Sequence, residues 1–173
     1  MVKKIDPKKG GLSGIDEVMK NLNTEISKMK DRTMKGIILA GIHIRRDMED
    51  TFPKIPVDLG NLRASWFTVT TTGTSETKGG GFKGEEAGKM KEDHSKVIGE
   101  SKATIMGKKD PQMILGFTAN YAMWVHENVD AQFFGRGGKK PGRPESGAKF
   151  FEAHLDKNYK KILEIIAANT KIQ

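Results

Sequence analysis

Apolar residues recur at steps of three and four from Ile15 to Phe52, and no proline interrupts them. This spacing places them on one face of an α-helix. A helix of about 36 residues would be about 54 Å long, which is more than one face of a 173-residue domain can cover. The pattern predicts a long N-terminal helix over residues 13–52, continuous or broken near Gly36 or Gly41, part of which contacts something else.

The N-terminal part of this apolar stripe contains Met19, Leu22, Ile26 and Met29. In one arrangement the helix packs across a sheet and leaves this part loosely exposed. In the other arrangement this part packs on neighbouring subunits in a ring. We favour the second, because so continuous an apolar surface is rarely left in water. These four residues are therefore candidate oligomer contacts.

Two prolines, Pro53 and Pro56, end the helical pattern, because they lack backbone N–H groups and favour extended backbone in the residues before them. The carboxylate of Asp58 can then cap a short helical turn. Residues 65–72 are rich in β-branched and aromatic side chains, which favour a strand. The sequence therefore predicts a turn and a strand over residues 53–72.

The composition changes over residues 73–112, where Lys, Glu, Gly and Ser dominate. This composition favours a flexible insert, in which residues 103–106 could form a returning strand. Residues 113–147 follow, with a strand at their start, an aromatic segment at 121–125 that is a short helix or a strand edge, and a basic loop rich in Gly and Pro. A C-terminal helix is predicted over residues 148–173. Its apolar stripe consists of Phe151, Leu155, Tyr159, Ile162 and Ile166.

These elements together predict one α+β domain over residues 1–173. Residues 1–12 form a basic arm that is too poor in apolar residues to fold alone. The long N-terminal helix and the C-terminal helix are expected to pack on an antiparallel sheet of about four strands, which the flexible insert interrupts.

The chain has no cysteine, which excludes disulfide bonds and thiolate metal sites. It has no run of about 18 apolar residues and no apolar stretch after its basic N-terminus, so we expect neither a membrane span nor a secretory signal. Its net charge of +8 suits contact with nucleic acid and equally favours solubility. A protein of this composition is expected to stay in a cytoplasm or in a particle built there.

The sequence gives little support for catalysis. Residues 79–84 match G-x-G-x-x-G, but polar residues precede them, and Glu85 and Glu86 would repel a pyrophosphate. None of the histidines pairs with another at the spacing of a zinc motif; they are His43, His94, His126 and His154. We therefore expect no enzymatic activity, no cofactor and no metal site.

Three short motifs follow one another along the chain. Residues 56–65 read P-V-D-L-G-N-L-R-A-S, residues 121–128 read Y-A-M-W-V-H-E-N, and R-P at 143–144 precedes F-F-E-A-H-L at 150–155. They resemble the P-V-D-T-G-N-L-R-x-S, Y-A-x-x-V-E-x-G and R-P-x-P-F-F-x-x-A-L segments of a family of minor virion proteins of long-tailed bacteriophages, the neck, head-tail connector or tail-completion proteins. Leu59 replaces the family's Thr, and Asn128 replaces its Gly. The residues that we assign to these motifs are Pro56, Asp58, Gly60, Leu62, Arg63, Ser65, Tyr121, Glu127, Pro144, Phe150 and Phe151.

The resemblance implies a structural virion protein without catalysis. Subunits of this kind form a homo-oligomeric ring at the junction of head and tail, and genomic DNA passes through the lumen without sequence-specific contacts. The implied neighbours are head-completion and tail-tube proteins. The implied location is the neck or the top of the tail, with the host cytoplasm as the place of assembly and no contact with a membrane.

Two polar features are expected to support this role. Arg63 and Glu127 are each flanked by apolar residues, so they either form a partly buried bridge or remain two separate solvated charges. Lys139, Lys140 and Arg143 are candidates for contact with DNA or with an adjacent ring.

The alternative function is that of a basic nucleic-acid-binding protein. Trp66, Tyr121 and Trp124 could stack on bases, although core packing is the favoured role for them. Salt-sensitive binding of DNA by the isolated monomer would support the alternative.

Overall fold

The computed structural model describes residues 12–73, 75–77, 81–133 and 145–171. The basic arm up to residue 11 lies outside the described residues, as do Lys139, Lys140, Arg143 and Pro144. The helices are α1 (Leu12–Asp50), α2 (Asn61–Ala64), α3 (Ala87–Ile105), α4 (Ala122–Glu127) and α5 (Phe150–Thr170), and the strands are β1 (Trp66–Thr70), β2 (Ser75–Thr77) and β3 (Met113–Phe117). The fold is therefore α+β. None of the helices in the described part of the chain combines the length and the apolar character needed to cross a membrane.

Helix α1 is continuous over 39 residues, so the long N-terminal helix is confirmed and is not broken at either glycine. A Cβ atom on Gly36 would lie 3.0 Å from Cα of Ile166 in α5, and one on Gly41 would lie 2.6 Å from Cε of Met113 in β3. Both glycines therefore permit the close approach of a neighbouring element. They are packing positions within the helix.

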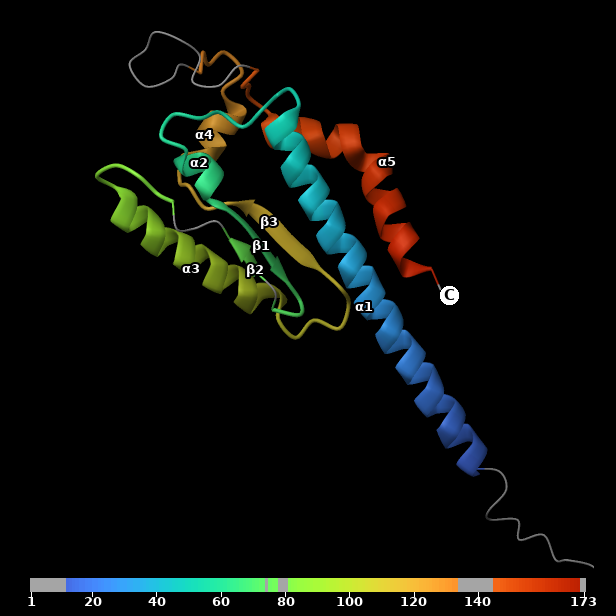
Figure 1. The fold of residues 1–173 in the computed structure, drawn as a ribbon. Coiled ribbons are helices and arrows are strands. Elements are labelled where there is room, and N and C mark those ends of the chain that lie inside the picture. Colours follow the sequence, from blue (N-terminus) through green and yellow to red (C-terminus); the bar gives the residue numbers. More distant parts are fainter. Residues whose placement is uncertain (1–11, 74, 78–80, 134–144, 172–173) are drawn as a thin grey trace, which may run out of the picture.

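The sheet lies between two helices, with α3 on one face and α1 on the other (Figure 1). Its strand order is β2-β1-β3, and both pairings are antiparallel. Successive side chains of β1 point to opposite faces. Phe67 and Val69 pack with Ile98 and Ile105 of α3, while Trp66 belongs to the cluster on the side of α1. All five residues of β1 are buried, because both faces of the sheet are covered.

Two expectations about the middle of the chain are wrong. The sheet has three strands in the described residues, where about four were expected. The predicted flexible insert contains the 19-residue helix α3, and residues 103–106 lie at its C-terminal end instead of forming a returning strand. The helix forms because His94, Ile98 and Ile105 share one face and are buried on the sheet, while its polar residues point to solvent.

The C-terminal helix is confirmed, but it packs chiefly on α1 and not on the sheet. It runs along the side of α1 that faces away from the sheet (Figure 1). Its buried face contains Phe150, His154 and Asn158. Leu155 and Tyr159 of the predicted apolar stripe are exposed, so that part of the prediction is wrong. The aromatic start of α5 reaches the sheet, where Phe150 and Phe151 contact the ring of Phe117.

A polar cluster holds α5 against α1. Nδ1 of His154 lies 2.7 Å from Oδ2 of Asp47, and its Nε2 lies 3.1 Å from the carbonyl oxygen of Pro53. The His154 ring is fully buried between these two acceptors. The side-chain amide of Asn158 donates from Nδ2 to the same carboxylate at 2.6 Å, and its Oδ1 accepts from Nε2 of His43 at 3.0 Å.

The Asp47 carboxylate is the centre of this cluster. Burial alone would raise its pKa, but hydrogen bonds from Asn158, His154 and Thr51 outweigh burial and hold the pKa well below its usual range. The carboxyl group is therefore ionised wherever the protein is folded near neutral pH. Three residues of α5, namely His154, Lys157 and Asn158, contact this carboxylate of α1, so the cluster joins the two helices.

Candidate functional site

The N-terminal half of α1 carries an exposed apolar surface. We name it the α1 seam; it consists of Ile15, Val18, Met19, Leu22, Ile26 and Met29. The exposed fraction of Leu22 is 52%, whereas that of Met34 is 5% and that of Ile44 is 1%. In Figure 1 this half of the helix extends past the end of α5 and past the sheet. The candidate oligomer contacts are thus exposed in the part of the chain that the structure describes.

A second exposed apolar surface lies at α4. We name it the α4 patch; it consists of Met123, Trp124 and Val129, whose exposed fractions are 74%, 78% and 68%. The expectation that Trp124 packs in the core is therefore wrong. Trp66 is buried as expected, and the exposed fraction of Tyr121 is 37%, which is intermediate between those of the two tryptophans. The α4 patch and the α1 seam lie at opposite ends of the molecule (Figure 1).

Arg63 does not bridge to Glu127. Its guanidinium donates to Glu49 of α1, with N to O distances of 2.9 and 2.7 Å. Arg45 contacts the same carboxylate at 2.7 Å, and its guanidinium carbon lies 5.4 Å from the centre of the Trp66 ring. Glu49 is closer because the turn after α1 folds α2 back against the last turns of that helix. The motif arginine therefore ties α2 to α1.

Glu127 has a different set of partners. It accepts from Lys149 at 2.6 Å and from Nδ1 of His126 at 2.7 Å, and these bonds lower its pKa, the bond from Lys149 most. Lys149 also lies 2.9 Å from Glu152. His126, Glu127 and Glu152 are close enough to hold a cation, but the Lys149 ammonium already lies between the two carboxylates. The group therefore joins α4 to α5.

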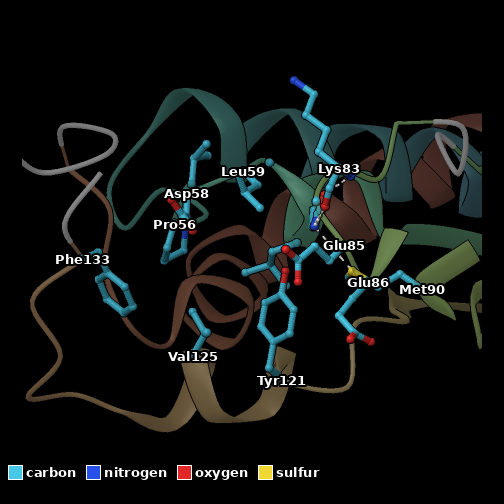
Figure 2. A pocket seen from close by; sticks show the side chains of 15 residues that line it. Pro56, Asp58, Leu59, Lys83, Glu85, Glu86, Met90, Tyr121, Val125 and Phe133 are labelled. Atoms are coloured by element: carbon cyan, nitrogen blue, oxygen red, sulfur yellow. Dashed lines mark hydrogen bonds between the residues drawn. The ribbon is translucent and has the colours of Figure 1, made fainter. Parts of the chain in front are cut away.

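A cavity of about 470 Å³ lies beside α2, and five motif residues line it: Pro56, Asp58, Gly60, Leu62 and Tyr121. Figure 2 shows Pro56, Asp58 and Leu59 on one side of it, with Tyr121 and Val125 of the α4 region on another. Burial raises the pKa of the Tyr121 phenol, and the nearby charge of Asp58 raises it further. Tyr121 therefore keeps its proton at neutral pH and can donate or accept a hydrogen bond.

Asn61 was not singled out from the sequence, yet it fixes the wall of this cavity. Its Nδ2 donates to the carbonyl oxygen of Lys83 at 2.8 Å, and its Oδ1 accepts from the N–H of Lys83 at 2.8 Å (Figure 2). This pair joins the segment before α3 to the motif turn. Ser65 is also structural, because its buried hydroxyl donates to the carbonyl oxygen of Leu62 at 2.8 Å. The only sequence signal for Asn61 was its place inside the first motif.

Gly60 directly precedes α2, and its φ of 88° lies in the left-handed region. Gly60 therefore occupies the N-cap position, which corrects the prediction that Asp58 caps this helix. Nothing lies within 4 Å of a Cβ atom built there, so only the backbone conformation opposes a side chain.

Replacing Gly60 by Val is expected to lower the free energy of unfolding by about 1–3 kcal/mol, because a β-branched residue is strained at this φ. Leu59→Thr, at a half-buried neighbour, should cost less. Urea unfolding measures both, and Gly99→Ala, in open space on α3, serves as the control for a harmless glycine change. Equal costs for Gly60→Val and Leu59→Thr would contradict this account of the turn.

The motif residues that the structure describes lie in three neighbouring parts of the fold. Residues 56–65 form the turn and α2, Tyr121 and Glu127 lie at the two ends of α4, and Phe150 and Phe151 begin α5. Comparison of the chain with models of protein families, with curated proteins and with solved structures finds no significant match.

Proposed function

We propose that this protein is a structural subunit of a tailed bacteriophage, a neck or tail-completion protein that forms a ring at the junction of head and tail. The three motifs suggest the family, and the exposed α1 seam is the observation that carries the assembly role. Genomic DNA would pass through the lumen of the ring. Head-completion and tail-tube proteins would be its neighbours in the virion.

The chemistry of the α1 seam supports assembly in preference to a free monomer. Fully burying one large aliphatic side chain is worth about 1.5–3 kcal/mol, and the seam holds six apolar residues that are 38–65% exposed. The α4 patch is a second apolar surface at a different place on the same chain. Two different surfaces favour heterologous contacts, in which each subunit meets the next in the same way and the series can close into a ring.

Electron microscopy of the purified full-length chain tests this proposal. We expect closed rings with a central channel wide enough for a DNA duplex, formed without any added nucleic acid. A protein that stays monomeric at high concentration and binds duplex DNA tightly would overturn the ring. That outcome would favour the alternative of a basic nucleic-acid-binding protein.

The basic loop gives a separate prediction. Replacing Lys139, Lys140 and Arg143 by Gln should leave ring formation intact, because the α1 seam is unchanged. Binding to DNA or to an acidic neighbouring ring should weaken, and the difference from the wild type should shrink as salt is raised. A salt titration by fluorescence anisotropy measures the effect. Loss of the ring in this variant would mean that the loop lies between subunits.

A further inference from the structure

The α1 seam continues a contact surface that α5 already uses. The residues of α1 that contact α5 include Thr33, Gly36, His43 and Asp47. With the buried Ala40 they recur at alternating steps of three and four. The same steps continue toward the N-terminus through Met29, Ile26, Leu22, Met19 and Ile15. Alternating steps of this kind mark one continuous face for packing against another helix.

Helix α5 covers only the C-terminal part of this face. It ends at Thr170, whose hydroxyl oxygen lies 3.4 Å from that of Thr33. On the N-terminal side of Thr33 the described residues place no second helix along α1 (Figure 1). The uncovered stretch from Ile15 to Met29 is about 21 Å long at 1.5 Å per residue, which is enough for two heptads of a helix pair.

We propose that a second copy of this chain covers the α1 seam, and that its α1 runs antiparallel to the first. The spacing of the seam is symmetric about a point between Met19 and Leu22, because Ile15 lies four residues before Met19 and Ile26 lies four residues after Leu22. A two-fold axis at this point brings Met19 against Leu22 of the second copy. It also brings Ile15 against Ile26 of the second copy, so each of these four residues faces an apolar residue of the other copy.

This register leaves room for α5. The second copy's α1 begins at Leu12. Leu12 and Met29 are equally far from the two-fold axis along the helix, so Leu12 of the second copy lies opposite Met29 of the first. Met29 is one helical turn away from Thr33, where α5 ends. The second copy's α1 and the first copy's α5 therefore follow each other end to end along one face of α1, and both run antiparallel to it.

A parallel pair does not fit the same face. It would carry the second copy's residues 33–47, together with the α5 packed on them, against the α5 of the first copy. The antiparallel pair instead carries the body of the second copy beyond the N-terminal end of the first α1. Steric room therefore selects the antiparallel direction.

The proposal of an antiparallel pair does not depend on the proposed ring. The pair is the form in which a free subunit keeps its seam out of water, and incorporation into a ring would exchange the second copy for a neighbouring subunit. Exposed apolar surface of this size otherwise favours aggregation. The seam thus has two successive partners, both of them copies of this chain.

Disulfide cross-linking tests the pair cleanly, because the chain has no cysteine of its own. Ile15→Cys and Ile26→Cys are made as separate proteins, and each is checked for folding by circular dichroism. Under mild oxidation we expect the mixture to form a covalent dimer at least tenfold faster than either protein alone. Non-reducing gels give the rate, and mass spectrometry identifies the linked peptides. A mixture of Ile15→Cys with Ile42→Cys is the control, because Ile42 is exposed on α1 but lies off the seam.

Two results would overturn the antiparallel pair. One is cross-linking of each single variant with itself as fast as in the mixture, which indicates a parallel contact. The other is a mixture that links no faster than the Ile42 control. Below the protein concentration at which rings form, absence of the cross-link rejects the pair and leaves the ring untouched. The cross-link without rings at any protein concentration rejects the ring and keeps the pair.

Discussion

Replacing Leu22 and Ile26 together by Asp is expected to produce a folded monomer that no longer associates. Both side chains are exposed in the single chain, so their carboxylates can remain in water there. Between two copies the same carboxylates would be buried without partners, which costs several kcal/mol. A loss of this size lowers the association constant by about three orders of magnitude or more. Sedimentation velocity across a range of protein concentrations measures the change.

The matched control for this variant is Leu39→Asp with Ile42→Asp. Leu39 and Ile42 lie on the same helix and have exposed fractions of 39% and 44%, close to those of the seam residues, but they are off the seam. Association should survive in the control. Unfolding of the Leu22 and Ile26 variant would show that the stripe belongs to the monomer's own core, and unchanged association would show that the seam is not an interface.

Replacing His154 by Ala is expected to lower the free energy of unfolding by about 3–5 kcal/mol. The substitution removes a fully buried side chain together with its contacts to the Asp47 carboxylate and the Pro53 carbonyl. Urea unfolding followed by circular dichroism measures the cost. Arg46→Ala breaks the exposed pair with Asp50 on the same helix and should cost at most about 1 kcal/mol. Similar losses of unfolding free energy in the two variants would contradict the view that the buried His154 contacts hold α5 against α1.

The polar cluster around Asp47 also predicts how stability depends on pH. The pKa of Asp47 is lowered in the folded protein, so its contribution is fully present above the ordinary carboxyl pKa of about 3.9 and is lost as the pH falls below it. Wild type should therefore lose more stability than Asp47→Asn between pH 5 and pH 2. Identical pH dependence of the two proteins, measured by thermal unfolding, would show that Asp47 is not held in its ionised form.

Regular periodicity and proline made several elements predictable from the sequence. The apolar steps from Ile15 onward gave α1, the β-branched run gave β1, and Pro53 marked the end of the long helix. Helix α3 escaped prediction because its buried face contains one histidine and few aliphatic residues among many lysines and glycines. A helix that is stabilised by packing on a sheet need not show a strong pattern of its own.

The partners of polar residues were the hardest part to predict. Arg63 had several acidic residues within reach, and only the folded turn brings Glu49 to it. Tyr159 of the predicted apolar stripe is exposed to solvent, and α5 instead buries His154 and Asn158 against α1. The hydrogen bonds of His154 and Asn158 with Asp47 stabilise this orientation of the helix. The seam was predictable because a long, regular apolar stripe exceeds what one small domain can cover.

Hydrogen exchange at increasing protein concentration tests most directly whether the α1 seam lies between copies. We expect the amides of residues 15–29 to become at least tenfold more protected as concentration rises through the range in which the chain associates. Residues 34–48 pack on α5 and on the sheet within one chain, so their protection should stay constant. Equal, fast exchange of residues 15–29 at every concentration would contradict the claim that copies of this chain meet at the seam.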